Sequence, residues 1–157
     1  MDRGRRSAAE IVDGDYRVDG EARRAWEVEV EDDALAEVDA TVHDACPRIS
    51  RFFSIPLTHN EGPSLLRYER GGFYGPHVDC LADGSDEWPR RISVIVFLTT
   101  AADGDGGTLR LHPGNQFAAP VDIPPAAGTL VAFPSEWLHE VLSVTRGVRD
   151  SIVDWLS

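Results

Sequence analysis

Two residue types that bind metals stand almost side by side in the segment His77-Val78-Asp79. On an extended segment, side chains at positions i and i+2 project to the same face, so this imidazole and this carboxylate would point the same way. Together they could chelate one divalent ion. The motif is short enough to arise from composition alone, so it needs support from elsewhere in the chain.

A third candidate ligand is His139, which lies in a run, 137–142, that otherwise has the pattern of a core strand. Burying an imidazole without a partner costs about 1–3 kcal/mol, so a histidine in this position indicates a role. Two histidines and one carboxylate on one side of a metal leave three coordination positions open, which suits an Fe(II) oxygenase. A structural zinc site would normally complete its four ligands with cysteines, and no cysteine pair is available here.

Beyond His139 stand Arg149 and Ser151, whose side chains would face the same way on a strand. In a largely apolar cavity, a guanidinium fork suits the far carboxylate of a bound ligand, and a hydroxyl can share in holding it. Arg146 competes for this role. The adjacent Gly147, however, predicts a turn that would leave Arg146 exposed.

The elements that must position these residues change character near residue 60. Before it, apolar residues recur at spacings of three and four, which predicts an amphipathic helix over roughly 33–46. The acidic residues 31–33 would stabilise its start, and Pro47 should end or kink it. The first 25 residues carry little pattern, and a strand near Ile11 or Trp26 is the expectation there.

After residue 60, short β-type segments alternate with turn residues. The run 91–100 is β-branched and apolar on both faces, as in a central strand. Further strands are predicted over 108–111, 116–121, 129–133, 138–144 and 151–156. Many short strands at near-regular spacing favour a sandwich, barrel or jelly roll. We therefore expect one mainly β (α+β) domain over 1–157, with a helical and strand support in 1–60 and the catalytic core in 61–157.

Several motifs, taken in order, resemble the prolyl 4-hydroxylase-like group of 2-oxoglutarate-dependent Fe(II) dioxygenases. The run 66–79 (LRYERGGFYGPHVD) resembles the segment that leads into the family's His-x-Asp motif. The turn 106–109 (GGTL) is similar to its Gly-Gly-Glu-Leu turn, with Thr108 where glutamate is usual. The strand 128–133 (GTLVAF), the spacing from His139 to Arg149, and Trp155 match the later part of the pattern. The resemblance covers roughly 63–155.

The resemblance implies a double-stranded β-helix, or jelly roll, with the site in its mouth. It implies Fe(II), 2-oxoglutarate and O2 as cofactors, with ascorbate as a candidate reductant. The reaction would hydroxylate an unactivated C–H bond in a prolyl residue, an amino acid or a small metabolite, while 2-oxoglutarate is decarboxylated to succinate and CO2. In this pattern the metal ligands are His77, Asp79 and His139, and the cosubstrate residues are Arg149, Ser151 and Tyr68.

Three aromatic residues bear on how the cosubstrate and the substrate would bind. Phe97 stands where some family members have another tyrosine, so one hydrogen bond to the cosubstrate would be missing here. Tyr74 and Trp88 are candidate substrate contacts. Trp88 lies in the loop 83–89, directly after the metal motif, and a loop in this position can serve as a lid over the substrate or as ordinary packing.

Composition narrows the partners and the location. The net charge of −12 would repel nucleic-acid backbones and anionic membranes, so we expect a small-molecule or peptidyl substrate as the partner and leave the oligomeric state open. The chain has no apolar run of bilayer length and no apolar signal core, so we expect a cytoplasmic protein.

The sequence leaves the state of the two cysteines open: Cys46 and Cys80 could be free thiols or one disulfide. His43, His59 and His112 are expected on the surface.

Two other functions fit part of the pattern. A catalytically silent, cupin-like metal-binding or sensor module would need the metal ligands but no cosubstrate anchor, so Arg149 and Ser151 weigh against it. Halogenation would require loss of the carboxylate ligand, and Asp79 is present. Succinate release from 2-oxoglutarate in the presence of Fe(II) separates an oxygenase from a silent module.

Overall fold

The computed structural model describes residues 6–9, 11–13, 15–17, 20–80, 89–114 and 118–157. Its elements are β1 (Arg6–Ala8), β2 (Ile11–Asp13), β3 (Asp15–Arg17), β4 (Arg23–Arg24), β5 (Trp26–Val28), α1 (Asp32–Phe53), β6 (Ser64–Tyr68), β7 (Phe73–His77), β8 (Ile92–Phe97), β9 (Leu109–His112), β10 (Val121–Ile123), β11 (Leu130–Pro134), β12 (Leu138–Val141) and β13 (Arg149–Leu156).

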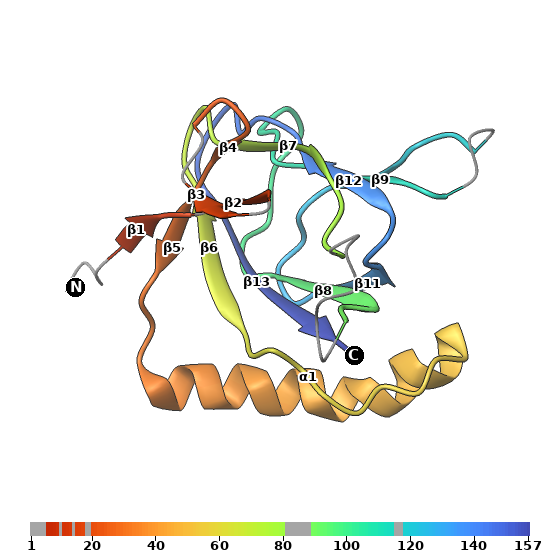
Figure 1. Cartoon of the computed structure of the whole chain (residues 1–157). Helices are drawn as coiled ribbons and strands as arrows, with labels where there is room; N and C mark the ends of the chain where they lie inside the picture. Colours follow the sequence, from red (N-terminus) through yellow and green to blue (C-terminus); the bar gives the residue numbers. More distant parts are fainter. Residues whose placement is uncertain (1–5, 10, 14, 18–19, 81–88, 115–117) are drawn as a thin grey trace.

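The strands form two antiparallel sheets, and α1 lies beneath them (Figure 1). The first sheet has six strands in the order β1-β5-β6-β13-β8-β11, and the second has five in the order β10-β9-β12-β7-β4. The short β2 and β3 form a separate pair. Strands from the first sixty residues thus extend both sheets, and the rest of the sheets comes from the segment beyond.

Both faces of the first sheet are covered at β8, a mostly apolar strand that lies between β13 and the edge strand β11. Ile92 and Val94 point outward and pack with Val42 of α1. On the opposite face, Ile95 and Phe97 pack against residues of β9 and β11 between the two sheets. The alternation of side chains along a strand therefore separates a helix-facing core from the interior in which the site lies.

Helix α1 continues through Pro47 to Phe53, so the predicted end at residue 46 is wrong. Proline removes one backbone donor, and its ring crowds the carbonyl group one turn earlier, which normally interrupts a helix. Beyond the proline, Ile49 and Phe53 pack together with Val42 against the outer face of the first sheet. This tertiary packing outweighs the local preference of one residue.

Replacing Pro47 with Ala should raise the free energy of unfolding by about 1–3 kcal/mol. A proline inside a helix costs about 3 kcal/mol relative to alanine, and part of this gain is offset because proline also restricts the unfolded chain. Pro47 is exposed, so its replacement opens no cavity in the core. Urea denaturation of the two proteins measures the difference. An unchanged or lower midpoint for Pro47→Ala would contradict the expectation.

Apart from the one over 116–121, the predicted strands are present, with shifted ends. The 91–100 segment forms β8. The strand predicted over 138–144 is shorter, since β12 ends at Val141, and its register with β7 shifts between His139 and Val141. The 116–121 prediction begins outside the described residues, and β10 starts only at Val121. The expected strands near Ile11 and Trp26 are β2 and β5.

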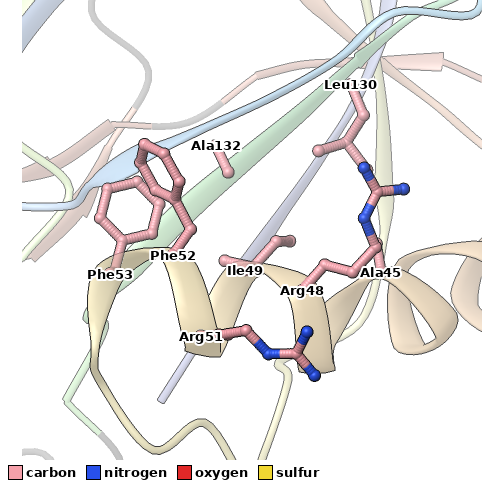
Figure 2. Close-up of a pocket in the computed structure, with 8 residues that line it drawn as sticks. All are labelled: Ala45, Arg48, Ile49, Arg51, Phe52, Phe53, Leu130 and Ala132. Atoms are coloured by element: carbon pink, nitrogen blue, oxygen red, sulfur yellow. The ribbon is translucent and has the colours of Figure 1, made fainter.

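A groove of about 720 Å³ lies between the C-terminal half of α1 and β11, which is the edge strand of the first sheet. Figure 2 shows Phe52 and Phe53 at one end of it and Leu130 beside Arg48 at the other. Phe52 is 81% exposed. The helix therefore leaves part of the outer face of β11 open.

The structure decides one question that composition left open. Cys46 on α1 and Cys80 after β7 are both free thiols, so they do not form a disulfide. In the part of the chain that is described, no helix combines the length and the apolar character needed to cross a membrane.

Candidate metal centre and cosubstrate site

His77 and His139 lie opposite each other on neighbouring strands. His77 is the last residue of β7, His139 lies in β12, and the two are direct partners in the antiparallel register. Asp79 follows β7, and its backbone N–H donates to the carbonyl of Ser135 at 2.9 Å. The ligand-type atoms of His77, Asp79 and His139 lie within 4.8 Å of one another. The structure thus brings together the three residues that the sequence nominates as metal ligands.

Backbone carbonyls set the orientation of both histidine rings. Nδ1 of His77 lies 2.8 Å from the carbonyl oxygen of Gly75, and Nδ1 of His139 lies 2.9 Å from that of Trp137. A carbonyl oxygen can only accept, so each Nδ1 carries the proton and donates it. The Nε2 atoms are left to face Asp79, at 3.6 Å from Oδ1 for His77 and 3.4 Å from Oδ2 for His139. Second partners of this kind typically orient metal-binding histidines.

Burial and neighbouring charges shape the protonation of the site. Burial, together with the nearby His139, lowers the pKa of His77 to about 4, so the ring is neutral at neutral pH. Burial alone would raise the pKa of Asp79, but His139, His77 and the Ser93 hydroxyl together hold that pKa well below its usual range. A carboxylate and an unprotonated imidazole nitrogen therefore face each other, and a cation between them would relieve their mutual repulsion.

This donor set fits a divalent iron ion. Two imidazole nitrogens and one carboxylate oxygen, grouped on one side, form the arrangement that non-haem Fe(II) oxygenases use, and it leaves the opposite side open for other ligands. His139 is 3% exposed, whereas the side chains of His77 and Asp79 are 17% and 12% exposed. A ligand could therefore reach the site from the His77 and Asp79 side.

Aromatic rings pack closely around the two histidines. The ring of Tyr74 stacks on His77 with centroids 3.5 Å apart, and Phe133 meets His139 edge-on at 4.8 Å. The guanidinium carbon of Arg23 lies 4.6 Å from the centroid of Tyr74. Tyr74 therefore lies at the site, and its role as a substrate contact stays a prediction. Trp88, the other predicted contact, is outside the described residues.

Arg149 is buried in the interior beside two aromatic rings. In the strand register, Arg149 of β13 lies opposite Tyr68 of β6, and Ser151 of β13 lies opposite Phe97 of β8. The pairing of these three adjacent strands therefore brings the four residues together. The guanidinium carbon lies 5.0 Å from the centroid of Tyr68 and 5.2 Å from that of Phe97. Arg149 is 3% exposed, and burial lowers its pKa. An arginine nevertheless remains charged.

Only part of the hydrogen-bonding capacity of this guanidinium is used within the described chain. Its Nη1 donates to the Ser151 hydroxyl at 2.9 Å, whereas Nε and Nη2 are buried with no hydrogen-bond partner. Leaving buried donors unsatisfied on a charged group is costly, and a carboxylate could accept from such a fork through two parallel bonds. These unsatisfied donors fit the far carboxylate of 2-oxoglutarate.

Two adjacent glycines allow close approaches of the backbone, Gly107 to the anchor itself and Gly106 to a neighbouring loop. A Cβ atom on Gly107 would lie 3.1 Å from Cδ of Arg149, and one on Gly106 would clash with the carbonyl oxygen of Ser143. Both glycines have positive φ angles, 71° and 78°. A cavity of about 300 Å³ is lined in part by Thr99, Gly106 and Arg149. The Gly-Gly turn noted in the sequence is therefore required where it stands.

Other polar residues lie where the sequence suggests, with one exception. The Arg146 side chain is 69% exposed and pairs with Asp105, away from the interior. His43 and His59 are exposed. His112 is the exception, because it ends β9 and is half-buried beside Glu140.

Two serines next to the metal centre were not anticipated. Ser93 donates to Asp79 Oδ2 at 2.7 Å, and its hydroxyl oxygen lies 2.9 Å from that of Ser135. The one signal in the sequence was a serine inside the otherwise apolar strand 92–97.

Comparison with known sequences agrees with the oxygenase-type site described above. Residues 63–157 match the model of the 2OG-Fe(II) oxygenase superfamily. The chain is 37% identical over 136 residues to a PKHD-type hydroxylase of Xanthomonas campestris pv. campestris (strain B100), an alignment that covers 80% of this chain and 58% of the relative. The chain thus spans less than two thirds of the length of that relative.

Solved structures agree with the fold. A prolyl-4-hydroxylase of Pseudomonas putida superposes with a TM-score of 0.73 at 26% identity, covering 88% of this chain and 74% of that one. A viral collagen prolyl hydroxylase from Paramecium Bursaria Chlorella virus-1, solved with 2OG, has a TM-score of 0.66 at 19% identity, covering 85% and 77%. The predicted jelly roll is confirmed. With the family model matching more than half of its length, the chain belongs to the 2OG-Fe(II) oxygenase superfamily.

Proposed function

We propose that this chain is an Fe(II)- and 2-oxoglutarate-dependent dioxygenase that hydroxylates an unactivated C–H bond. The observation that carries the proposal is the combination of a His-Asp-His cluster with a buried arginine that has two unsatisfied donors. A protein that only binds metal has no use for such an arginine, whereas a bound dicarboxylate would satisfy it.

Each residue has a specific task in this proposal. His77, Asp79 and His139 would hold the iron from one side, with their orientation set by the carbonyls of Gly75 and Trp137. When bound, iron, 2-oxoglutarate and O2 together supply the oxidising chemistry of the family, which yields succinate and CO2. The protein's contribution is to hold geometry and to exclude water from that chemistry.

The cosubstrate would extend from the metal centre into the interior between the sheets. Arg149 would bind its far carboxylate through Nε and Nη2, while Ser151 holds Nη1 of the same guanidinium. Tyr68 and Phe97, which are 1% and 0% exposed, enclose the charge in apolar surroundings. In such surroundings a charged hydrogen bond is stronger than in water, which favours tight and specific binding of a dicarboxylate.

Among substrates we place a prolyl residue first, ahead of a free amino acid or a small metabolite. The basis is the likeness in fold and sequence to the Pseudomonas putida prolyl-4-hydroxylase. Tyr74 and Trp88 remain the proposed substrate contacts, and ascorbate the proposed reductant. A reducing compartment such as the cytoplasm would agree with the two free thiols. A nucleic-acid or anionic membrane partner is not proposed, because the net charge is −12.

Anaerobic addition of Fe(II) and then 2-oxoglutarate to the apoprotein should produce a weak visible charge-transfer band. The band requires both molecules in one site, so it tests the proposed pairing of the metal cluster with Arg149. Succinate is a suitable control, because it lacks the keto group and should give no band. If the folded protein develops no band, the cosubstrate assignment is wrong.

The activity itself is tested by succinate release from 2-oxoglutarate in air, first without and then with candidate substrates. A prolyl peptide that raises the rate and gains one oxygen atom by mass spectrometry would support the proposal at the level of substrate. If the protein binds iron but releases no succinate with any substrate class, it acts instead as a cupin-like metal-binding module.

A further inference from the structure

We propose that Ser93 and Ser135 are positioning residues that hold Asp79 in the orientation needed to bind metal, an inference that rests on the proposed function. Neither residue belongs to the cluster of ligand-type side chains. Both are almost completely buried, at 1% and 0% exposure, directly beside it. The Ser93 hydroxyl and the Ser135 backbone carbonyl hydrogen-bond to Asp79, and the Ser135 hydroxyl lies against that of Ser93.

The direction of the hydrogen bonds follows from chemistry. The Asp79 carboxylate can only accept, so the hydroxyl proton of Ser93 goes to Oδ2, at 2.7 Å. The oxygen of Ser93 is then the acceptor for the hydroxyl of Ser135, at 2.9 Å. The two serines form a short chain that ends on the carboxylate, and such chains strengthen each bond through polarisation.

This chain supplies a constraint that Asp79 lacks by itself. The terminal torsion of an aspartate has a broad energy minimum, so a carboxylate beyond the end of a strand can rotate readily. With Oδ2 held by Ser93, rotation is restricted, and the two carboxylate oxygens stay 3.6 Å and 3.4 Å from Nε2 of His77 and His139. The serine pair thus preorganises the carboxylate before the metal arrives.

Ser135 also links the ligands through its backbone. Its carbonyl oxygen accepts N–H bonds from Asp79 at 2.9 Å and from Cys80 at 3.3 Å. Two residues later in the same turn, Trp137 accepts the Nδ1–H bond of His139 at 2.9 Å. The turn between β11 and β12 therefore positions a ligand on each side of it, and a change in this turn would misalign the carboxylate and one imidazole together.

The test is binding of Mn(II), followed by the loss of the electron paramagnetic resonance signal of the free ion. Ser93→Ala should weaken Mn(II) binding by about 10- to 100-fold, the usual loss when an outer partner of a metal ligand is removed. Ser135→Ala keeps the backbone carbonyl and loses only the distal hydroxyl, so the expected loss is about 3- to 10-fold. Ser93→Thr retains the hydroxyl and should remain close to the parent protein.

Ser50→Ala is the matched control, because it also removes one hydroxyl hydrogen bond, to the carbonyl of Ile55, but on the far helix. It should leave Mn(II) binding unchanged. Mn(II) binding by a folded Ser93→Ala that equals the parent would overturn the inference and leave the proposed function intact. If Ser93→Ala does not fold, undiminished binding by Ser135→Ala would overturn it. Absence of Mn(II) binding by the parent protein would instead overturn the metal centre, and this inference with it.

Discussion

Replacing His139 with Ala should abolish both iron binding and 2-oxoglutarate turnover, the largest effect expected from any single substitution in this chain. The Nε2 atom of His139 lies 3.4 Å from Asp79, and its ring is held by the carbonyl of Trp137 and by the edge of Phe133. With one of three protein ligands removed, the remaining pair cannot hold the ion on one side. The measurement is iron per chain after anaerobic loading, together with succinate release.

His112→Ala is the matched control for this experiment. His112 lies on the neighbouring strand β9 and contacts Glu140, outside the metal cluster. It should retain both iron and rate. Circular dichroism should show that His139→Ala is folded, because His139 is not itself part of the apolar core clusters. The expected loss in unfolding free energy is about 1–3 kcal/mol, from the hydrogen-bond partner left unsatisfied. His77→Ala and Asp79→Ala should behave in the same way. Full iron content and rate in His139→Ala would show that the ligand set is wrong.

Replacing Arg149 with Ala should weaken 2-oxoglutarate binding by about 3–5 kcal/mol, or roughly two to four decades in affinity. Two charge-assisted hydrogen bonds from Nε and Nη2 would be lost, and the far carboxylate would be left desolvated without a partner. The measurement is the apparent affinity for 2-oxoglutarate at saturating Fe(II). Iron binding in its absence should be unchanged, because Arg149 does not belong to the metal cluster.

Four further variants separate charge, shape and location. Arg149→Lys should be milder than Arg149→Ala because it keeps the charge without the fork. Arg149→Met fills much of the same space without a charge and should bind as poorly as the alanine variant. Ser151→Ala should cost about 1 kcal/mol, the scale of one ordinary hydrogen bond. Arg146→Ala should change little, since Arg146 is exposed and paired with Asp105. If Arg146→Ala strongly weakens 2-oxoglutarate binding and Arg149→Ala weakens it only mildly, the assignment of Arg149 as the anchor is wrong.

The helix end shows how far local patterns can be trusted. The spacing of apolar residues predicted α1 because an amphipathic face is a local property with a fixed period. Its end at Pro47 was mispredicted because the decisive contacts, those of Ile49 and Phe53, are with strands that begin about forty residues later in the chain. No local rule contains that information.

The candidate site likewise depends partly on local sequence and partly on contacts between distant segments. Residue type and spacing by themselves nominated His77, Asp79, His139 and Arg149, because ligand chemistry and the two-residue period of a strand are written directly in the chain. Tertiary structure alone decided which partners these residues meet. The β7–β12 register places His77 opposite His139, and the turn at Ser135 comes against Asp79 only when β11 and β12 have formed. Hydrogen-bond partners and burial depend on contacts between distant segments, so they arise only when the sheets assemble.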